Sequence, residues 1–289
     1  MRDRWHKDGS TLRHPAEVTM RADERKDCTG EGLTLPDWLA PLLLSPLVGS
    51  FLGVLIRRIP RGEPVTLSRS RCEACRRTLS AADLVPLLSH LILRGCCRGC
   101  GAPIAPFHWR VELAAAGVAL WVVLWATLSV GDFHLTGRIW ANCTLGWTLL
   151  ALVWIDLEHG RLPDLLTLPL VVAGLTATWV LEPWALADHA IGALVGYAVF
   201  RFLAVVYRVW RGREGLGGGD AKLLAAAGAW VGWQGLNSVV VIAALVGLAT
   251  ALARRSTGEP LGAATAVPFG PGLALGLWLV RLHAGVLAG

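Results

Sequence analysis

Two aspartates stand at the edges of apolar segments, where an acid is unusual. Asp220 follows three glycines in Gly217-Gly218-Gly219-Asp220, and Asp156 ends an apolar run in Trp154-Ile155-Asp156. Charged side chains against a bilayer are rare and usually mark function. Two carboxylates that meet across a helix bundle can share one proton and supply the acid and the base that activate water. The pair therefore indicates aspartyl protease chemistry on a peptide bond.

Each acid also has a structural explanation. Asp220 precedes an apolar segment and is well placed to cap a helix, and an acid at a membrane interface can simply be solvated. Two observations favour function. The glycines beside Asp220 let another backbone approach closely, and Asp156 ends a segment, where no N-cap is needed. We predict catalytic roles for Asp156 and Asp220, with supporting roles for Asp164, Gly217, Gly219 and Lys222. Asp164, in Leu162-Pro163-Asp164, equally fits a helix start.

Four of the seven cysteines form two CxxC pairs, Cys72 with Cys75 and Cys97 with Cys100, separated by 21 residues. Each pair presents two thiolates to one ion, and two pairs complete a tetrahedral zinc site. Disulfides or free thiols are the alternatives, and a cytoplasmic setting disfavours the disulfides. Because four thiolates leave no open position for water, we predict a structural zinc. We expect Cys28, Cys96 and Cys143 to be unliganded.

The composition indicates a membrane protein. Of 289 residues, 54% are hydrophobic and 17% charged, against about 25% charged in soluble domains. Several apolar runs are long enough to cross the ~30 Å hydrocarbon core as helices. We predict an all-α polytopic membrane protein of about eight spans. The predicted spans are residues 38–56, 111–130, 139–157, 165–181, 186–207, 221–233, 236–252 and 268–287.

Arginine placement predicts the orientation. The segments 57–110, 208–219 and 253–267 are rich in arginine and fall on one side of an eight-span protein. The positive-inside rule places them in the cytoplasm, and both acids then lie at the cytoplasmic interface. This orientation explains the net charge of +6 better than a nucleic-acid partner does, since no nucleic-acid-reading motif is present.

The chain divides into four predicted regions. Residues 1–35 are polar and lack the apolar core of a signal peptide, so we expect a disordered tail. Residues 36–57 form the first transmembrane helix, and residues 58–110 a cytoplasmic four-cysteine zinc domain. Residues 111–289 form the membrane-embedded protease core.

Six motifs in order resemble the type IV prepilin peptidase family, the bacterial branch of the GxGD membrane aspartyl proteases. They span residues 42–276. The motifs are Gly49-Ser50-Phe51-Leu52, Ser68-Arg69-Ser70-Arg71-Cys72, the two CxxC pairs, Ile155-Asp156 with Leu162-Pro163-Asp164, Gly217-Gly218-Gly219-Asp220, and Pro268-Phe269-Gly270-Pro271.

The resemblance implies an enzyme of the bacterial inner membrane. Such enzymes cleave the basic leader from prepilins or pseudopilins after a Gly, on the cytoplasmic side. Asp156 and Asp220 would be the catalytic pair and Asp164 a supporting residue. Many members also N-methylate the new terminus with S-adenosylmethionine, through the cysteine-containing domain. The implied partners are prepilin or pseudopilin substrates and membrane lipid, with no nucleic acid.

The chain departs from the family pattern only in or beside its first cytoplasmic region. Gly53 stands where Asn is usual after Gly-Ser-Phe-Leu. Asp83-Leu84-Val85-Pro86 lacks another usual Asn, and His108-Trp109 replaces a usual Tyr-Pro. These changes leave peptidase activity expected and methyltransferase activity open.

Two rival functions fit part of the pattern. A non-catalytic export scaffold or an ion- or proton-coupled transporter would use the acids to bind ions, but a transporter places such acids near the midplane. A methyltransferase without protease activity would not need the acid pair.

Overall fold

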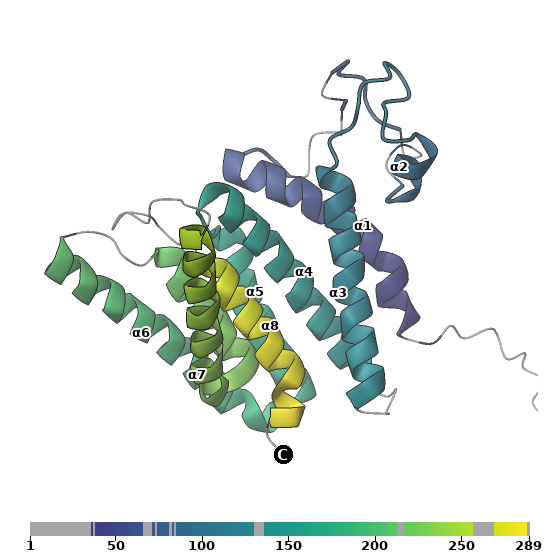
Figure 1. The fold of residues 1–289 in the computed structure, drawn as a ribbon. Helices are drawn as coiled ribbons and strands as arrows, with labels where there is room; N and C mark the ends of the chain where they lie inside the picture. Colours follow the sequence, from purple (N-terminus) through teal and green to yellow (C-terminus); the bar gives the residue numbers. More distant parts are fainter. Residues whose placement is uncertain are drawn as a thin grey trace, which may run out of the picture. The chain divides into compact units, whose positions relative to one another are not determined.

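The structure is a computed structural model that describes residues 36, 38–65, 71–72, 74–80, 83, 85–129, 136–212, 217–256 and 269–287. The predicted tail, residues 1–35, and Cys28 lie outside the described residues. The elements are α1 (Leu39–Arg58), η1 (Ile59–Arg61), α2 (Leu88–Ile92), α3 (Phe107–Ser129), α4 (Thr136–His159), α5 (Asp164–Leu181), η3 (Pro183–Ala185), α6 (Leu186–Arg211), α7 (Gly218–Ser256) and α8 (Gly270–Leu287). Among the described residues the regular elements are all helices, so the predicted all-α class is confirmed (Figure 1).

Six of the described helical segments are long and apolar enough to cross a membrane, by length and composition. They are Leu39–Arg61, Phe107–Leu128, Thr136–His159, Asp164–Leu181, Pro183–Arg211 and Gly218–Ser256. Many of their large apolar side chains are exposed on the protein surface, as expected where lipid is the solvent. The sequence predicted eight spans. Two of these, 221–233 and 236–252, lie within α7, and α8 is not among the six.

The direction of α7 reverses at Gly232, whose φ of 70° and ψ of 175° are not helical. Beyond this residue, Ala243 lies against Gly272 of α8 and Val239 against Gly276. This second arm therefore runs antiparallel to α8 and returns to the end of the bundle where α8 begins. The predicted spans 221–233 and 236–252 correspond to the two arms.

The first arm of α7 packs closely on α6. A Cβ on Gly228 would overlap the backbone of Gly192, and one on Gly196 would come within 2.6 Å of the Leu224 carbonyl oxygen. Small residues at such positions let membrane helices approach each other closely, where van der Waals contact drives association. The same pairings make α6 antiparallel to this arm.

Three polar side chains lie at or near the break in α7: His189 is buried, and Arg281 and Asn142 are partly buried. The carbonyl of Trp230 accepts a hydrogen bond from the Arg281 guanidinium at 3.3 Å. His189 Nδ1 lies 2.9 Å from the carbonyl oxygen of Ala229. Arg281 Nε also donates to Asn142 Oδ1 at 3.3 Å. These partners satisfy backbone carbonyls that lose their helical hydrogen bonds at the break.

The close approach of α6 and α7 yields a stability prediction. Gly228→Ala forces a methyl group into the backbone of Gly192, so we expect a loss of about 1–3 kcal/mol from overpacking. Thermal unfolding of the detergent-purified protein measures the loss. Gly117→Ala in α3 is the matched control, since a Cβ there meets nothing within 4 Å. Equal midpoint changes in the two variants would contradict the close packing of α6 and α7.

Candidate active site and metal centre

Asp156 lies in the last turn of α4 and is 8% exposed. The helix ends at His159 because Gly160 adopts a left-handed conformation (φ 62°) and donates its N–H to the carbonyl of Asp156 at 2.8 Å. This is a common way to end a helix. The Asp156 carboxyl group lies against Gly270, the first residue of α8, where a Cβ would overlap it.

Asp220 is the third residue of α7, inside the first turn rather than before it. Its carboxylate forms a hydrogen bond with the backbone of Gly217 and interacts electrostatically with Asp156. The bond to Gly217 resembles the contact in a capping box, in which an acid of the first turn binds the backbone N–H of the residue before the helix. Asp220 therefore also helps to cap the start of α7. The structure also brings the two predicted acids together from two different helices. We refer to the end of the helix bundle at which Asp156 and Asp220 lie as the aspartate end.

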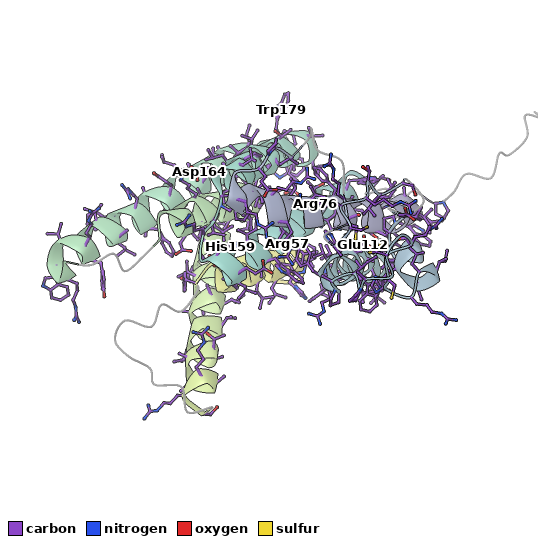
Figure 2. All side chains as sticks on the ribbon, turned by 90° about the horizontal axis from the view of Figure 1, so that it is seen from above. Arg57, Arg76, Glu112, His159, Asp164 and Trp179 are labelled. Atoms are coloured by element: carbon purple, nitrogen blue, oxygen red, sulfur yellow. The ribbon has the colours of Figure 1, made fainter. Side chains whose placement is uncertain are left out.

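The supporting acid Asp164 forms an ion pair with Lys222. Asp164 is the first residue of α5, directly after Pro163, so it also lies at the helix start predicted for it. Its side chain is 58% exposed and that of Lys222 is 28% exposed. The pair joins the start of α5 to the start of α7 beside Asp220. Figure 2 views the molecule with Asp164 and with His159, the last residue of α4, labelled.

Leu162 lies beside the acids and was not predicted as a site residue. A Cβ on Gly219 would come within 2.8 Å of Leu162 Cβ, and one on Gly270 within 3.4 Å of Leu162 Cδ1. The lack of a side chain at Gly219 therefore allows the Leu162 side chain to approach closely. In the sequence, the one sign that Leu162 could pack at this site was its apolar side chain in the short connection between Gly160 and Pro163.

The cysteine-containing segment emerges at the aspartate end. The guanidinium of Arg57, at the end of α1, lies 4.1 Å from the ring centre of Phe107, at the start of α3. Phe107 makes an edge contact with Trp154 of α4, with ring centres 5.4 Å apart. Trp154 precedes Asp156 by two residues, so the segment between α1 and α3 and the acid pair share one end of the bundle.

Glu112 anchors this segment to α3. It is a buried acid, 7% exposed, and its Oε2 accepts the N–H of Leu87 at 2.8 Å. His90 of α2 stacks on Trp109, with ring centres 6.0 Å apart. Leu91 and Ile92 of the same short helix are exposed.

The four predicted metal ligands meet at one point. The Sγ atoms of Cys72, Cys75, Cys97 and Cys100 all lie within 4.8 Å of one another. Cys72 Sγ and Cys100 Sγ are 3.9 Å apart, close to the ~3.8 Å edge of a tetrahedron with metal–sulfur bonds of about 2.3 Å. The donor set therefore fits a tetrahedral metal ion.

The two CxxC segments share one backbone geometry. Cys72 donates its N–H to the Arg77 carbonyl at 2.9 Å, and Cys97 donates to the Ala102 carbonyl at 2.8 Å. Backbone N–H groups of Cys100 and Gly99 lower the pKa of Cys97 to about 6, whereas the pKa of Cys100 is raised to about 11 by its neighbouring thiols and by burial, so Cys97 is the first of these two thiols to ionise. Cys96 Sγ instead lies 3.7 Å from the Arg94 carbonyl oxygen, and Cys143 is buried in α4.

Metal analysis tests this site. Cys72→Ser removes one of four thiolates, and we expect the metal bound per chain to fall severalfold with reduced thermal stability, because a structural site contributes folding energy. Cys96→Ser is the control, since it removes a neighbouring thiol outside the cluster. Elemental analysis of both purified variants measures the effect. Equal metal content in the two variants would exclude the four-cysteine site.

The arrangement defines a class of protein: a helical membrane protein with an acid pair at one end and a four-cysteine segment at the same end. Residues 43–126 match the bacterial peptidase A24 N-terminal domain, and residues 143–252 match the type IV leader peptidase family. The chain belongs to this family.

Relatives support the assignment along most of the chain. A prepilin leader peptidase/N-methyltransferase of Aeromonas hydrophila is 37% identical over 83% of this chain and 88% of that protein. Proteins of the same name from Burkholderia pseudomallei (strain 1026b) and Pseudomonas aeruginosa are 37% and 35% identical, over 81% and 84% of this chain and 82% and 89% of their own lengths. No solved structure matches the chain.

Proposed function

We propose that the chain is a membrane aspartyl endopeptidase that removes the basic leader from prepilins or pseudopilins. The meeting of Asp156 and Asp220 at one end of the bundle carries this proposal. Family membership and the names of the relatives support it. We assign the catalytic roles to these two acids, with Asp164, Lys222, Gly217 and Gly219 in support.

The chemistry follows from two neighbouring carboxyl groups of which one is ionised. The carboxylate takes a proton from a water molecule as the water oxygen attacks the scissile carbonyl carbon. The other, protonated acid donates its proton to the peptide nitrogen as the carbon–nitrogen bond breaks. Gly270 and Leu162 lie beside Asp156.

The location of the acids suits a substrate that is part helix and part basic leader. Asp156 lies in the last turn of one membrane helix and Asp220 in the first turn of another. A bond between an apolar helix and a polar leader lies at this same depth, at the membrane interface. The arginine-rich segments next to the aspartate end support a cytoplasmic position for it, in the bacterial inner membrane.

The same location counts against an ion or proton transporter. Such proteins hold their ionisable groups near the bilayer midplane, often at broken helices. The described break, at Gly232, is flanked by Arg281 and His189 rather than by the acid pair.

We further infer that the four cysteines hold zinc in a structural role, since four thiolates fill a tetrahedral shell.

N-methylation of the new terminus is a second proposed activity. The relatives' names include it, and the matched N-terminal domain contains the cysteine segment. S-adenosylmethionine is the expected methyl donor. A reaction with a prepilin peptide and this donor should yield a product one methyl group heavier than the product formed without it. A product of unchanged mass would restrict the enzyme to proteolysis.

Substitution of either acid tests the peptidase assignment. Asp156→Asn and Asp220→Asn each remove an ionisable oxygen that water activation requires, so we expect leader cleavage to fall by about 10³-fold or more. Cleavage of a prepilin by the reconstituted protein, read by mass, measures the loss. Asp188→Asn, an exposed acid in the first turn of α6, should retain activity. Full cleavage by either dyad variant would remove that residue from the mechanism.

The ion pair between Asp164 and Lys222 gives a separate test of the supporting roles. Asp164→Lys or Lys222→Asp alone places like charges together, and we expect both cleavage and thermal stability to fall. The double exchange restores opposite charges, so it should recover part of each loss, with a coupling energy of about 0.5–3 kcal/mol. Additive effects in the double variant would show that the pair does not couple α5 to α7.

A further inference from the structure

Leu162 lies in a short connection that is held at both ends. At one end, Gly160 donates its N–H to the Asp156 carbonyl, which ties the connection to the end of α4. At the other, the Pro163 carbonyl accepts the N–H of Leu166 at 3.1 Å, within the first turn of α5. The Asp164–Lys222 ion pair fixes the next residue to α7. The side chain of Leu162 is therefore held in place next to the acids.

This side chain fills the space where three backbones meet. A Cβ on Gly219 would lie 2.8 Å from Leu162 Cβ, 3.3 Å from its Cδ1 and 3.4 Å from its Cγ. A Cβ on Gly270 would lie 3.4 Å from Leu162 Cδ1, and the same Cβ would overlap the Asp156 carboxyl group. Leu162 Cδ1 and the Asp156 carboxyl group therefore both lie close to the point where a Cβ on Gly270 would be.

We propose that Leu162 is a specificity-determining residue, which restricts the residue preceding the scissile bond to the smallest side chains. The inference rests on the proposed peptidase function. For water to attack, the scissile carbonyl carbon must come within reach of Asp156 and Asp220. The Cβ of the residue that supplies this carbonyl is then only two bonds from the reacting carbon. Leu162 already occupies the volume beside Asp156 that such a Cβ would enter.

Substitution of the neighbouring glycines, Gly219 and Gly270, cannot enlarge the space for the substrate. A side chain on Gly219 or Gly270 would collide with Leu162 or Asp156 themselves, so these two positions keep the acids and the connection together. Leu162 differs, because shortening it removes atoms without creating a collision. It is therefore the position at which a single substitution should enlarge the space for substrate.

A substrate series tests the assignment. Peptides identical except for Gly, Ala or Val before the scissile bond are incubated with the reconstituted full-length chain, and kcat/KM is measured for each. With the unmodified protein we expect cleavage to fall steeply from Gly to Ala to Val. Leu162→Ala should raise the Ala-to-Gly ratio of kcat/KM by about tenfold or more, the scale of one methylene in a tight pocket. Leu162→Val should give an intermediate ratio.

Leu165→Ala is the matched control, because this leucine is three residues away and 62% exposed. It should leave the ratio unchanged. If Leu162→Ala speeds or slows all peptides equally, the residue acts as a lid or as simple packing, and the proposal is overturned. An unchanged ratio overturns it as well.

Two further outcomes separate this inference from the function on which it rests. Leu162→Ala and Leu162→Val are both checked by thermal unfolding. If both are folded yet cleave no peptide, Leu162 serves catalysis rather than selection, and the proposal fails. If the unmodified protein itself cleaves none of the peptides, the peptidase function fails and this inference fails with it. If the unmodified protein cleaves the peptides and Leu162→Ala leaves the Ala-to-Gly ratio of kcat/KM unchanged, only this inference fails.

Discussion

Two carboxyl groups that approach each other at the edge of a bilayer repel when both are charged, and neither is well solvated there. Such a pair persists only where the surrounding structure holds both backbones firmly. Here Asp156 is fixed by the end of α4 and by Gly270 of α8, while Asp220 is fixed by the first turn of α7. The glycines in these segments matter because they allow backbones and the Leu162 side chain to come into contact. The glycines beside the two aspartates therefore serve the packing of these segments, and the aspartates serve the proposed chemistry.

The reversal of α7 brings both arms of this helix, and the start of α8, to the aspartate end. Because the helix turns back at Gly232, both its arms reach the aspartate end, and the second arm aligns α8 so that Gly270 meets Asp156. Figure 1 shows α8 running from this region toward the opposite end, where the chain finishes. The break leaves buried carbonyls that Arg281 and His189 engage. Two charged or polar side chains far from the acids thus support the element that carries Asp220.

Much of the site could be predicted from sequence because its determinants are local or topological. The CxxC spacing dictates its own backbone turn, and the order of apolar segments decides which ends of the helices share a face. Helix boundaries followed the apolar runs, with differences of a few residues where polar residues extend α3 and α6 beyond them. The partners of Arg281 and the position of Leu162 could not be predicted. They depend on which helices touch and in what register, and an apolar pattern does not specify either.

The cysteine segment and the acid pair are linked through aromatic contacts rather than through the chain alone. Arg57, Phe107 and Trp154 connect the end of α1, the start of α3 and the last turns of α4, and Glu112 holds the segment against α3. A metal ion bound by the four thiolates would stiffen a segment in which, among the described residues between Ile56 and Phe107, Cys97 is the one buried apolar side chain. Phe107 and Trp154 thus form a route of direct contacts from this segment to the helix turn that carries Asp156. The departures from the family pattern at His108 and Trp109 fall on this same route, so they can alter the segment without touching the acids.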